Sequence, residues 1–213
     1  MVTSSRFAGI IAALALFGCF GQNLDKKMIL AAKRGDSKTV AALIARGANV
    51  SAVDEDGWTP LMWGAAHGDE ATVAALLDAG ADIRAATRRD HQGVLILASK
   101  WNRPSVVSLL LSRGIPVQQA DKIGWTALMW AALQGRSDVV SALLDGGAPV
   151  DTRDSDGNTP LILAARKGKI ETVQILLAHG ADASARNAGG DTAASAAAAG
   201  GYAKIAELLK ARG

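Results

Sequence analysis

The sequence predicts an all-α fold, a solenoid of six helix–turn–helix units stacked side by side. One phrase recurs along the 213 residues, and its fullest copy is GWTPLMWGAAHG at residues 57–68. The glycines that close successive copies are 33 or 34 residues apart: Gly47, Gly80, Gly114, Gly147, Gly180 and Gly213. A unit of this length cannot bury its apolar face alone, so the period predicts a stacked array.

The elements of one unit follow from residue types with known local preferences. Residues 54–57, DEDG, predict a turn with acidic corners and a glycine that tolerates positive φ. Thr59 can cap the next helix with its hydroxyl, and Pro60 suits the first helical position. A short helix is predicted over residues 61–67 and a second over residues 70–79, and a glycine ends each.

Two columns of residues recur along the chain, one in all six units and one in the first five, and predict how the helices pack. Small residues stand where one helix must pass close to the next: Ala31-Ala32, Gly64-Ala65, Ala98-Ser99, Ala131-Ala132, Ala164-Ala165 and Ala197-Ala198. Large apolar pairs mark the second helix: Leu43-Ile44, Leu76-Leu77, Leu110-Leu111, Leu143-Leu144 and Leu176-Leu177. Neither helix is long enough to be stable alone, so both depend on these columns.

With these motifs the chain resembles the ankyrin-repeat family over about Leu24 to Gly213. The Thr-Pro-Leu and Gly-Ala-Asp motifs that carry the resemblance are best preserved in units two and five. The resemblance implies short hairpin-like fingers, two antiparallel helices in each unit, and protein partners bound on a concave surface. The family often has histidine after Thr-Pro-Leu, whereas here apolar residues replace it in all but the last unit, which has Ser195.

The chain divides into a leader, residues 1–22, and a repeat domain, residues 23–213. The predicted units are 24–47, 48–80, 81–114, 115–147, 148–180 and 181–213. The end units have the character of caps. Unit one places Lys26-Lys27 where Thr-Pro would stand, and unit six is rich in alanine. A polar outer face on the terminal units keeps such a stack soluble.

The leader has the pattern of a bacterial secretory signal that is cleaved on export. Arg6 precedes an apolar run, residues 8–17, which is too short to span a bilayer. The LFGC segment ending at Cys19, the only cysteine, resembles a lipobox and predicts lipidation there. Two alternatives remain open: cleavage after Gly21 without lipid, and an N-terminal helix that belongs to the fold. Lipidation at Cys19 and cleavage after Gly21 both place the protein in the periplasm, lipid-anchored in the first case and free in the second.

Composition argues against several functional classes. The net charge of +3 is weak for a nucleic-acid-binding protein, and no basic stripe is visible in the sequence. The three histidines fall in different units and lack metal-ligand spacing, and no nucleophile motif or phosphate loop is present. We therefore expect no enzyme activity, no catalytic residues, no metal and no cofactor.

Tryptophans and one leucine are the candidate partner-binding residues. If the resemblance holds, Trp58, Trp101, Trp125 and Leu133 are exposed on one face of units two to four. Tryptophan is over-represented at binding hot spots. The alternative is that each indole packs locally over the neighbouring finger. Trp63 and Trp130 fall in a different column, which we interpret as core.

The finger of unit three departs from the repeat and is a second candidate site. It holds one extra residue, Gly93-Val94 replaces Thr-Pro, and the segment carries the basic residues Arg84, Arg88, Arg89 and His91. Loops tolerate insertions and often carry function, so these residues could bind an anionic ligand. The competing interpretation is drift on a solvated loop beside the acidic finger 54–56.

The sequence as a whole predicts an exported, non-enzymatic, monomeric repeat protein. It would bind a protein partner through its concave face, as an inhibitor or scaffold in the periplasm, without contacting nucleic acid. Its only membrane contact would be a lipid on Cys19. Two rival functions remain: an intracellular scaffold or host-directed effector, and a ligand-binding protein that uses the finger between Arg84 and His91.

Overall fold

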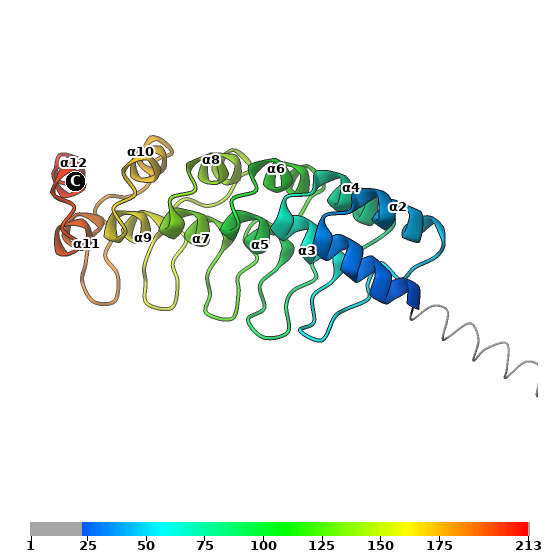
Figure 1. The fold of residues 1–213 in the computed structure, drawn as a ribbon. Coiled ribbons are helices and arrows are strands. Elements are labelled where there is room, and N and C mark those ends of the chain that lie inside the picture. Colours follow the sequence, from blue (N-terminus) through cyan, green and yellow to red (C-terminus); the bar gives the residue numbers. More distant parts are fainter. Residues whose placement is uncertain (1–22, 213) are drawn as a thin grey trace, which may run out of the picture.

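The structure, a computed structural model, describes residues 23–212 and forms a single elongated array of paired helices (Figure 1). Between successive pairs, the chain descends into a long loop on the same side of the array, which we call the finger. The predicted all-α solenoid is confirmed: within the described residues, extended pairing is limited to isolated bridges such as Ala86 with Gly93.

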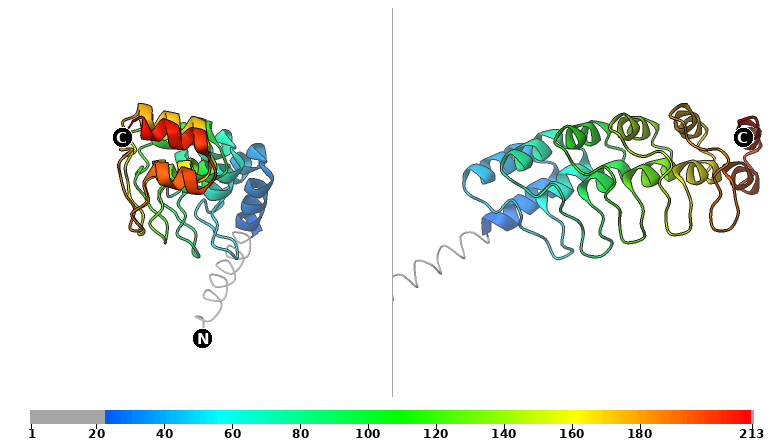
Figure 2. Two further views of the ribbon diagram at one scale, coloured as in Figure 1. Left: turned by 90° about the vertical axis from the view of Figure 1, so that its left-hand side faces the viewer. Right: turned by 180° about the vertical axis from the view of Figure 1, so that it is seen from behind.

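The helices lie in two rows. The inner row follows the fingers and begins with a helix that includes residues 23–34. It continues with α3 (Pro60–His67), α5 (Val94–Lys100), α7 (Ala127–Gln134), α9 (Pro160–Arg166) and α11 (Ala193–Ala199). The outer row is α2 (Ser37–Ala45), α4 (Glu70–Asp78), α6 (Pro104–Ser112), α8 (Ser137–Asp145), α10 (Ile170–Ala178) and α12 (Ala203–Lys210). Figure 2 shows the two rows and the fingers from two further sides.

Threonine caps begin most of the inner helices, as the sequence predicts. The Thr59 hydroxyl accepts the backbone N–H of Met62 at 3.2 Å. Thr126 and Thr159 cap α7 and α9 in the same way, and Thr192 forms a reciprocal capping box on α11. Among units two to six, unit three is the exception, because Gly93 stands at this position and has no side chain to cap α5.

The turn between the two helices of each unit has a left-handed residue at one fixed position. These residues have φ between 57° and 82°: Gly35, Gly68, Asn102, Gly135, Gly168 and Gly201. At Gly68, Gly135 and Gly168 the absence of a side chain leaves room for a residue of the next unit. A methyl group on Gly68 would meet the Arg103 Cδ at 2.6 Å, and one on Gly168 would meet the Tyr202 ring at 2.3 Å. The turn therefore keeps all inner helices in one register.

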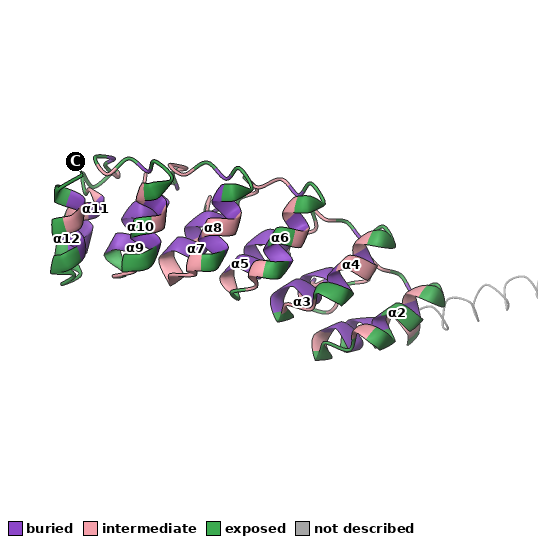
Figure 3. Cartoon of the chain, turned by 90° about the horizontal axis from the view of Figure 1, so that it is seen from above, coloured by how far each residue is buried: buried purple, intermediate pink, exposed green. Residues whose placement is uncertain are grey.

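The core runs the whole length of the array between the rows (Figure 3). The small column is buried except at Ala198 in the last unit, which is exposed, and Ala65, Ala131 and Ala165 are completely inaccessible to solvent. In the outer helices the first leucine of each pair is fully buried, as at Leu110 and Leu143. None of the described helices is both long enough and apolar enough to cross a bilayer.

Candidate functional site

An aspartate at the top of the finger fixes the local backbone in units two, four and five. The Asp54 Oδ1 accepts the backbone N–H groups of Asp56 at 3.1 Å and Trp58 at 2.9 Å. Asp121 accepts the N–H of Trp125 at 2.9 Å in the same way, and Asp154 accepts that of Asn158 at 2.8 Å. The structure thus confirms that these aspartates form turns.

The same aspartates gather two tryptophans each in units two and four. The rings of Trp58 and Trp63 have centroids 4.4 Å apart, and those of Trp125 and Trp130 are 4.9 Å apart. The indole N–H of Trp63 donates to the Asp54 Oδ2 at 3.0 Å. The Trp130 indole makes the corresponding bond to Asp121 at 2.8 Å.

A lysine from the preceding unit completes each group. The Lys33 Nζ lies 4.6 Å from the centroid of the Trp63 ring and 2.9 Å from the Asp54 Oδ2. In unit three the Lys100 Nζ lies 4.4 Å from the Trp130 centroid. An ammonium at this distance is attracted to the negative face of an indole. We call these groups the first cluster (Lys33, Asp54, Trp58, Trp63) and the second cluster (Lys100, Asp121, Trp125, Trp130).

These contacts correct two expectations about the tryptophans. Trp58 and Trp125 are half-buried rather than exposed, and at the equivalent position Gln92 and Asn158 are buried. The backbone N–H at this position donates to the finger aspartate, or to the Thr87 hydroxyl in unit three, and this bond holds the residue against the array. Trp63 and Trp130, expected in the core, contact it but stay half-buried because their N–H groups reach a carboxylate near the surface.

Trp101 and Leu133 lie at the other end of the inner helices. Trp101 is the residue that ends α5, and 55% of its surface is exposed. Leu133 is half-buried in the last turn of α7. Trp58 and Trp125 instead precede the first residues of α3 and α7, roughly 12 Å away along a helix of eight residues. The predicted partner residues therefore lie at both the N-terminal and the C-terminal ends of the inner helices.

The basic residues of the unit-three finger are all exposed: Arg84, Arg88, Arg89 and His91. Asp54 and Trp58 are four residues apart, but the corresponding Thr87 and Gln92 are five apart, so the extra residue lies between them. His91 absorbs it with a left-handed backbone, φ 52°. The Arg88 side chain covers Gly57 of the previous finger, where a methyl group would meet its Cγ at 2.5 Å. Among the described residues, none of the four forms an ion pair with the acidic finger.

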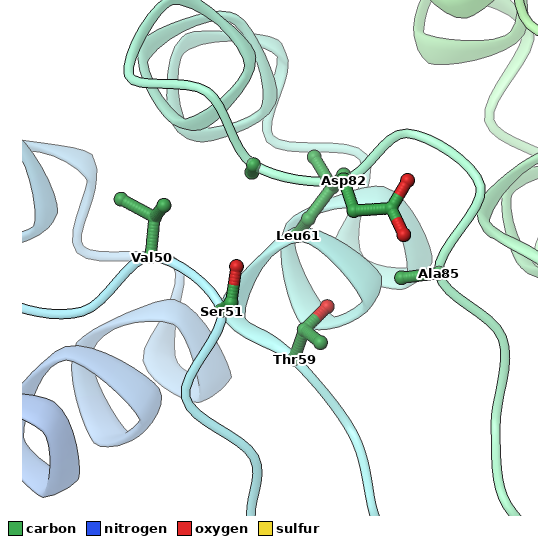
Figure 4. Close-up of a pocket in the computed structure, with 7 residues that line it drawn as sticks. Val50, Ser51, Thr59, Leu61, Asp82 and Ala85 are labelled. Carbon is green, nitrogen blue, oxygen red and sulfur yellow. The ribbon is translucent and has the colours of Figure 1, made fainter.

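Two surface hollows show no sign of a ligand-binding site. One, of about 210 Å³, lies between neighbouring loops and is drawn in Figure 4. Its polar groups are already bonded locally: Thr59 caps α3, and Asp82 accepts the N–H of Arg84 at 2.8 Å. The other is a shallow groove of about 590 Å³ between α6 and α8. Within residues 23–212, no three potential ligands are close enough to hold a metal ion.

A row of basic residues at the C-terminal ends of the inner helices was visible in the sequence columns but carried no prediction. These ends bear Lys33 and Arg34 in unit one, Lys100 in unit three, and Arg166 and Lys167 in unit five. Aligning the six units by their period shows this row, because cations recur at the same position in every second unit. We call these five residues the basic row.

The first cluster has a titration behaviour that follows from its contacts. Burial alone would raise the pKa of the Asp54 carboxyl, but hydrogen bonds outweigh burial and hold the pKa below its ordinary value of 3.8. The donors are the Lys33 ammonium, the Trp58 backbone and the Trp63 indole. A lowered pKa in the folded state stabilises the fold above the unfolded value, and this contribution is lost as the pH falls through the folded value.

Asp54→Asn should therefore lower the melting temperature at pH 7, and the difference from the wild type should shrink as the pH falls below about 3.8. Thermal unfolding followed by circular dichroism, at pH 7 and again below about pH 3.8, measures this difference in melting temperature. Glu55→Gln is the matched control, because Glu55 is exposed in the same finger and forms no ion pair in the described region. A difference that is constant with pH would contradict a role for the Asp54 charge.

Comparison with known families agrees with the repeat architecture. The family model described as "Ankyrin repeats (3 copies)" matches three successive segments, residues 14–87, 85–154 and 146–213. The first segment begins inside the predicted leader, which lies outside the described residues. A search of curated proteins finds no match. Since the matched segments cover nearly the whole chain and each falls on paired helices and fingers, the protein belongs to the ankyrin-repeat family.

Proposed function

We propose that this protein is a non-enzymatic, monomeric scaffold that holds one protein partner on the concave side of units two to four, formed by the inner helices and fingers. Ankyrin repeats are protein-interaction modules, and that coarse function applies to the family. The observation that carries the finer proposal is Trp101. More than half of the surface of Trp101, 55%, is open to solvent, and tryptophan is over-represented at binding hot spots.

The surroundings of Trp101 support an anchor that is ringed by polar groups. Leu133 adds apolar surface in the next unit, and Lys100 immediately precedes Trp101. The two tryptophan pairs are half-buried at α3 and α7, the inner helices on either side of α5, and the indoles of Trp63 and Trp130 are hydrogen-bonded. Rigid aromatic side chains lose little entropy when a partner covers them. The basic finger, by contrast, is a loop whose four cations are all exposed.

Site-specific crosslinking tests the face. A photo-crosslinking residue at position 101 should capture a specific protein from cell-envelope extract, and the same residue at Ser108 should not. Ser108 is exposed on α6, in the outer row of the same unit. The purified partner should then bind the full chain, and Trp101→Ala should weaken that binding. Capture from position 108 alone would place the partner on the other side of the array.

The location belongs to the same proposal: export to the periplasm, with a lipid on Cys19 as the membrane anchor. Its support is the sequence pattern of residues 1–22, which lie outside the described part of the chain. An anchored scaffold could act as an inhibitor or protective binder of one envelope protein.

Cys19→Ala should abolish incorporation of labelled palmitate and release the protein from the membrane fraction. The matched control, Ser4→Ala, leaves the lipobox-like segment intact and should keep the label. A mature wild-type protein that begins at Gln22 without lipid would instead be free in the periplasm.

A further inference from the structure

We propose that the basic row, together with Trp101, binds an acidic polypeptide segment of the partner. This inference deepens the proposed function and rests on it. Each inner helix ends in a pair of equivalent residues, the second of which is the last residue of the helix or its C-cap. From unit one to unit six these pairs are Lys33-Arg34, Ala66-His67, Lys100-Trp101, Leu133-Gln134, Arg166-Lys167 and Ala199-Gly200. Cations appear here in three units, and none of these positions holds aspartate or glutamate.

Most of these cations lack an internal counter-charge. Lys33 pairs with Asp54. Across the rest of residues 23–212, Lys100 forms no ion pair, although its ammonium lies over the Trp130 ring and donates to the Gln92 Oε1 at 3.4 Å. Arg34, Arg166 and Lys167 form no ion pair and are exposed. Unpaired charges of one sign along one surface create a potential that attracts the opposite charge.

The corresponding ends of the outer helices are arranged differently. There the charges alternate in sign and pair between units: Asp78 contacts Arg113 at 2.7 Å, and Asp145 lies 3.5 Å from His179. Cations at the C-terminus of a helix interact favourably with the helix dipole. A cation at a helix end is not required by this fold, because α4 and α8 end in aspartate.

The turns beside the row reinforce the charge in units three to five. The residue after the left-handed position is Asp36 and Asp69 in units one and two, where it caps an outer helix. In the next three units it is Arg103, Arg136 and Lys169. Arg103 donates from Nε to the Ala66 carbonyl at 2.9 Å, so it is committed to the fold while adding positive potential. The attraction is therefore strongest between Lys100 and Lys167.

The spacing of the row describes the segment that fits it. Adjacent inner helices pack in contact, about 10 Å apart, so cations in alternate units are about 20 Å apart. An extended chain rises about 3.3 Å per residue, so two acidic clusters about six residues apart would meet Lys100 and the Arg166-Lys167 pair. Trp101 adjoins Lys100, and Leu133 lies in the unit between Lys100 and the Arg166-Lys167 pair, so both suit apolar residues of the same segment.

Nucleic acid fits this surface less well. A duplex carries about one charge per 1.7 Å of its axis, and cations at steps of about 20 Å would leave most phosphates without a partner. The net charge of the chain is only +3. The geometry points to an acidic peptide segment with apolar residues between its charges.

A designed peptide tests the inference with the full chain. The probe is fluorescein-labelled, with two triglutamate clusters separated by about six residues that include leucine and tryptophan. Fluorescence anisotropy should show binding that weakens with salt. The double variant Arg166→Glu, Lys167→Glu should weaken it about tenfold or more. The control, Arg46→Glu with Lys204→Glu, changes the net charge equally at exposed outer-row positions and should bind like the wild type.

Several outcomes would overturn the inference. Equal weakening in both double variants would mean that peptide binding is a non-specific effect of net charge. If the peptide does not bind at all, the proposed site has no support. Tighter, row-dependent binding of oligothymidine or of phosphatidylglycerol vesicles would assign the row to nucleic acid or membrane. If a partner captured from position 101 binds the Arg166→Glu, Lys167→Glu variant as tightly as the wild type, the proposed function stands and this inference fails. Circular dichroism of each variant excludes misfolding as the cause of lost binding.

Discussion

Ala131→Leu is expected to destabilise the array by about 1–3 kcal/mol. Ala131 is completely buried on α7, at the position where the inner helices cross most closely. The helix α7 packs against α5 on one side and α9 on the other. Three additional carbon atoms must displace one of these neighbours, and a shift in one unit is passed along the stack. A loss of this size lowers the melting temperature of a domain of this length by roughly 2–12 °C.

Ala71→Leu is the matched control. Ala71 is an exposed residue of α4 in an internal unit, so the same added atoms meet solvent there. Thermal and urea unfolding of the two variants, followed by circular dichroism at 222 nm, separates a packing effect from a change in helix propensity. Equal midpoints for the two variants would mean that the helices are not in the register described above.

The period was sufficient to predict the array because its signals are local and repeat in every unit. Thr59 reaches only three residues along the chain to cap α3, and Gly80 has the left-handed backbone, φ 86°, that ends its unit. Likewise the small column predicts burial because only small residues allow close helices. Such signals depend on residues within one unit, so one sequence copy is enough to identify them.

The tryptophan clusters could not be predicted, because each depends on side chains from two units. Lys33, Asp54 and Trp63 span 30 residues, and only their relative orientation brings the ammonium, carboxylate and indole together. The column position of Trp58 was visible in the sequence. Its burial, however, depends on the hydrogen bond from its backbone N–H to the Asp54 carboxylate. Repeat spacing places a residue in the array without giving the direction of a long side chain.

Unit three shows the same limit. The extra residue was visible as an irregular spacing, yet the way it is accommodated was not. The left-handed His91 and the bond from the Gln92 N–H to the Thr87 hydroxyl close the finger without disturbing α5. Histidine is a less common choice for that conformation than glycine, and nothing in the sequence alone marks it. The backbone of the unit-three finger therefore accommodates the extra residue through local contacts, without a bound ligand.

The second large effect expected is on binding. Trp58→Ala together with Trp125→Ala should abolish capture of the partner identified through position 101, because both indoles lie on the finger side of the inner helices in units two and four. Each ring stacks on a second tryptophan, Trp63 or Trp130, and is half-buried. A measurable loss of stability is therefore expected at each site, smaller than the roughly 3–5 kcal/mol of a fully buried indole.

A second pair of variants separates binding from folding. Trp63→Phe with Trp130→Phe keeps an aromatic ring under each outer indole but removes the N–H donors to the finger aspartates, at 3.0 and 2.8 Å. Each lost bond leaves a carboxylate oxygen short of a donor, so this variant should also lose stability. It should nevertheless retain the partner, since Trp58 and Trp125 remain in place. If both double variants melt alike and both lose the partner, binding follows the stability of the fingers and the indoles at 58 and 125 are not contact residues. Loss of the partner only when Trp58 and Trp125 are removed would identify those two indoles as the contact surface.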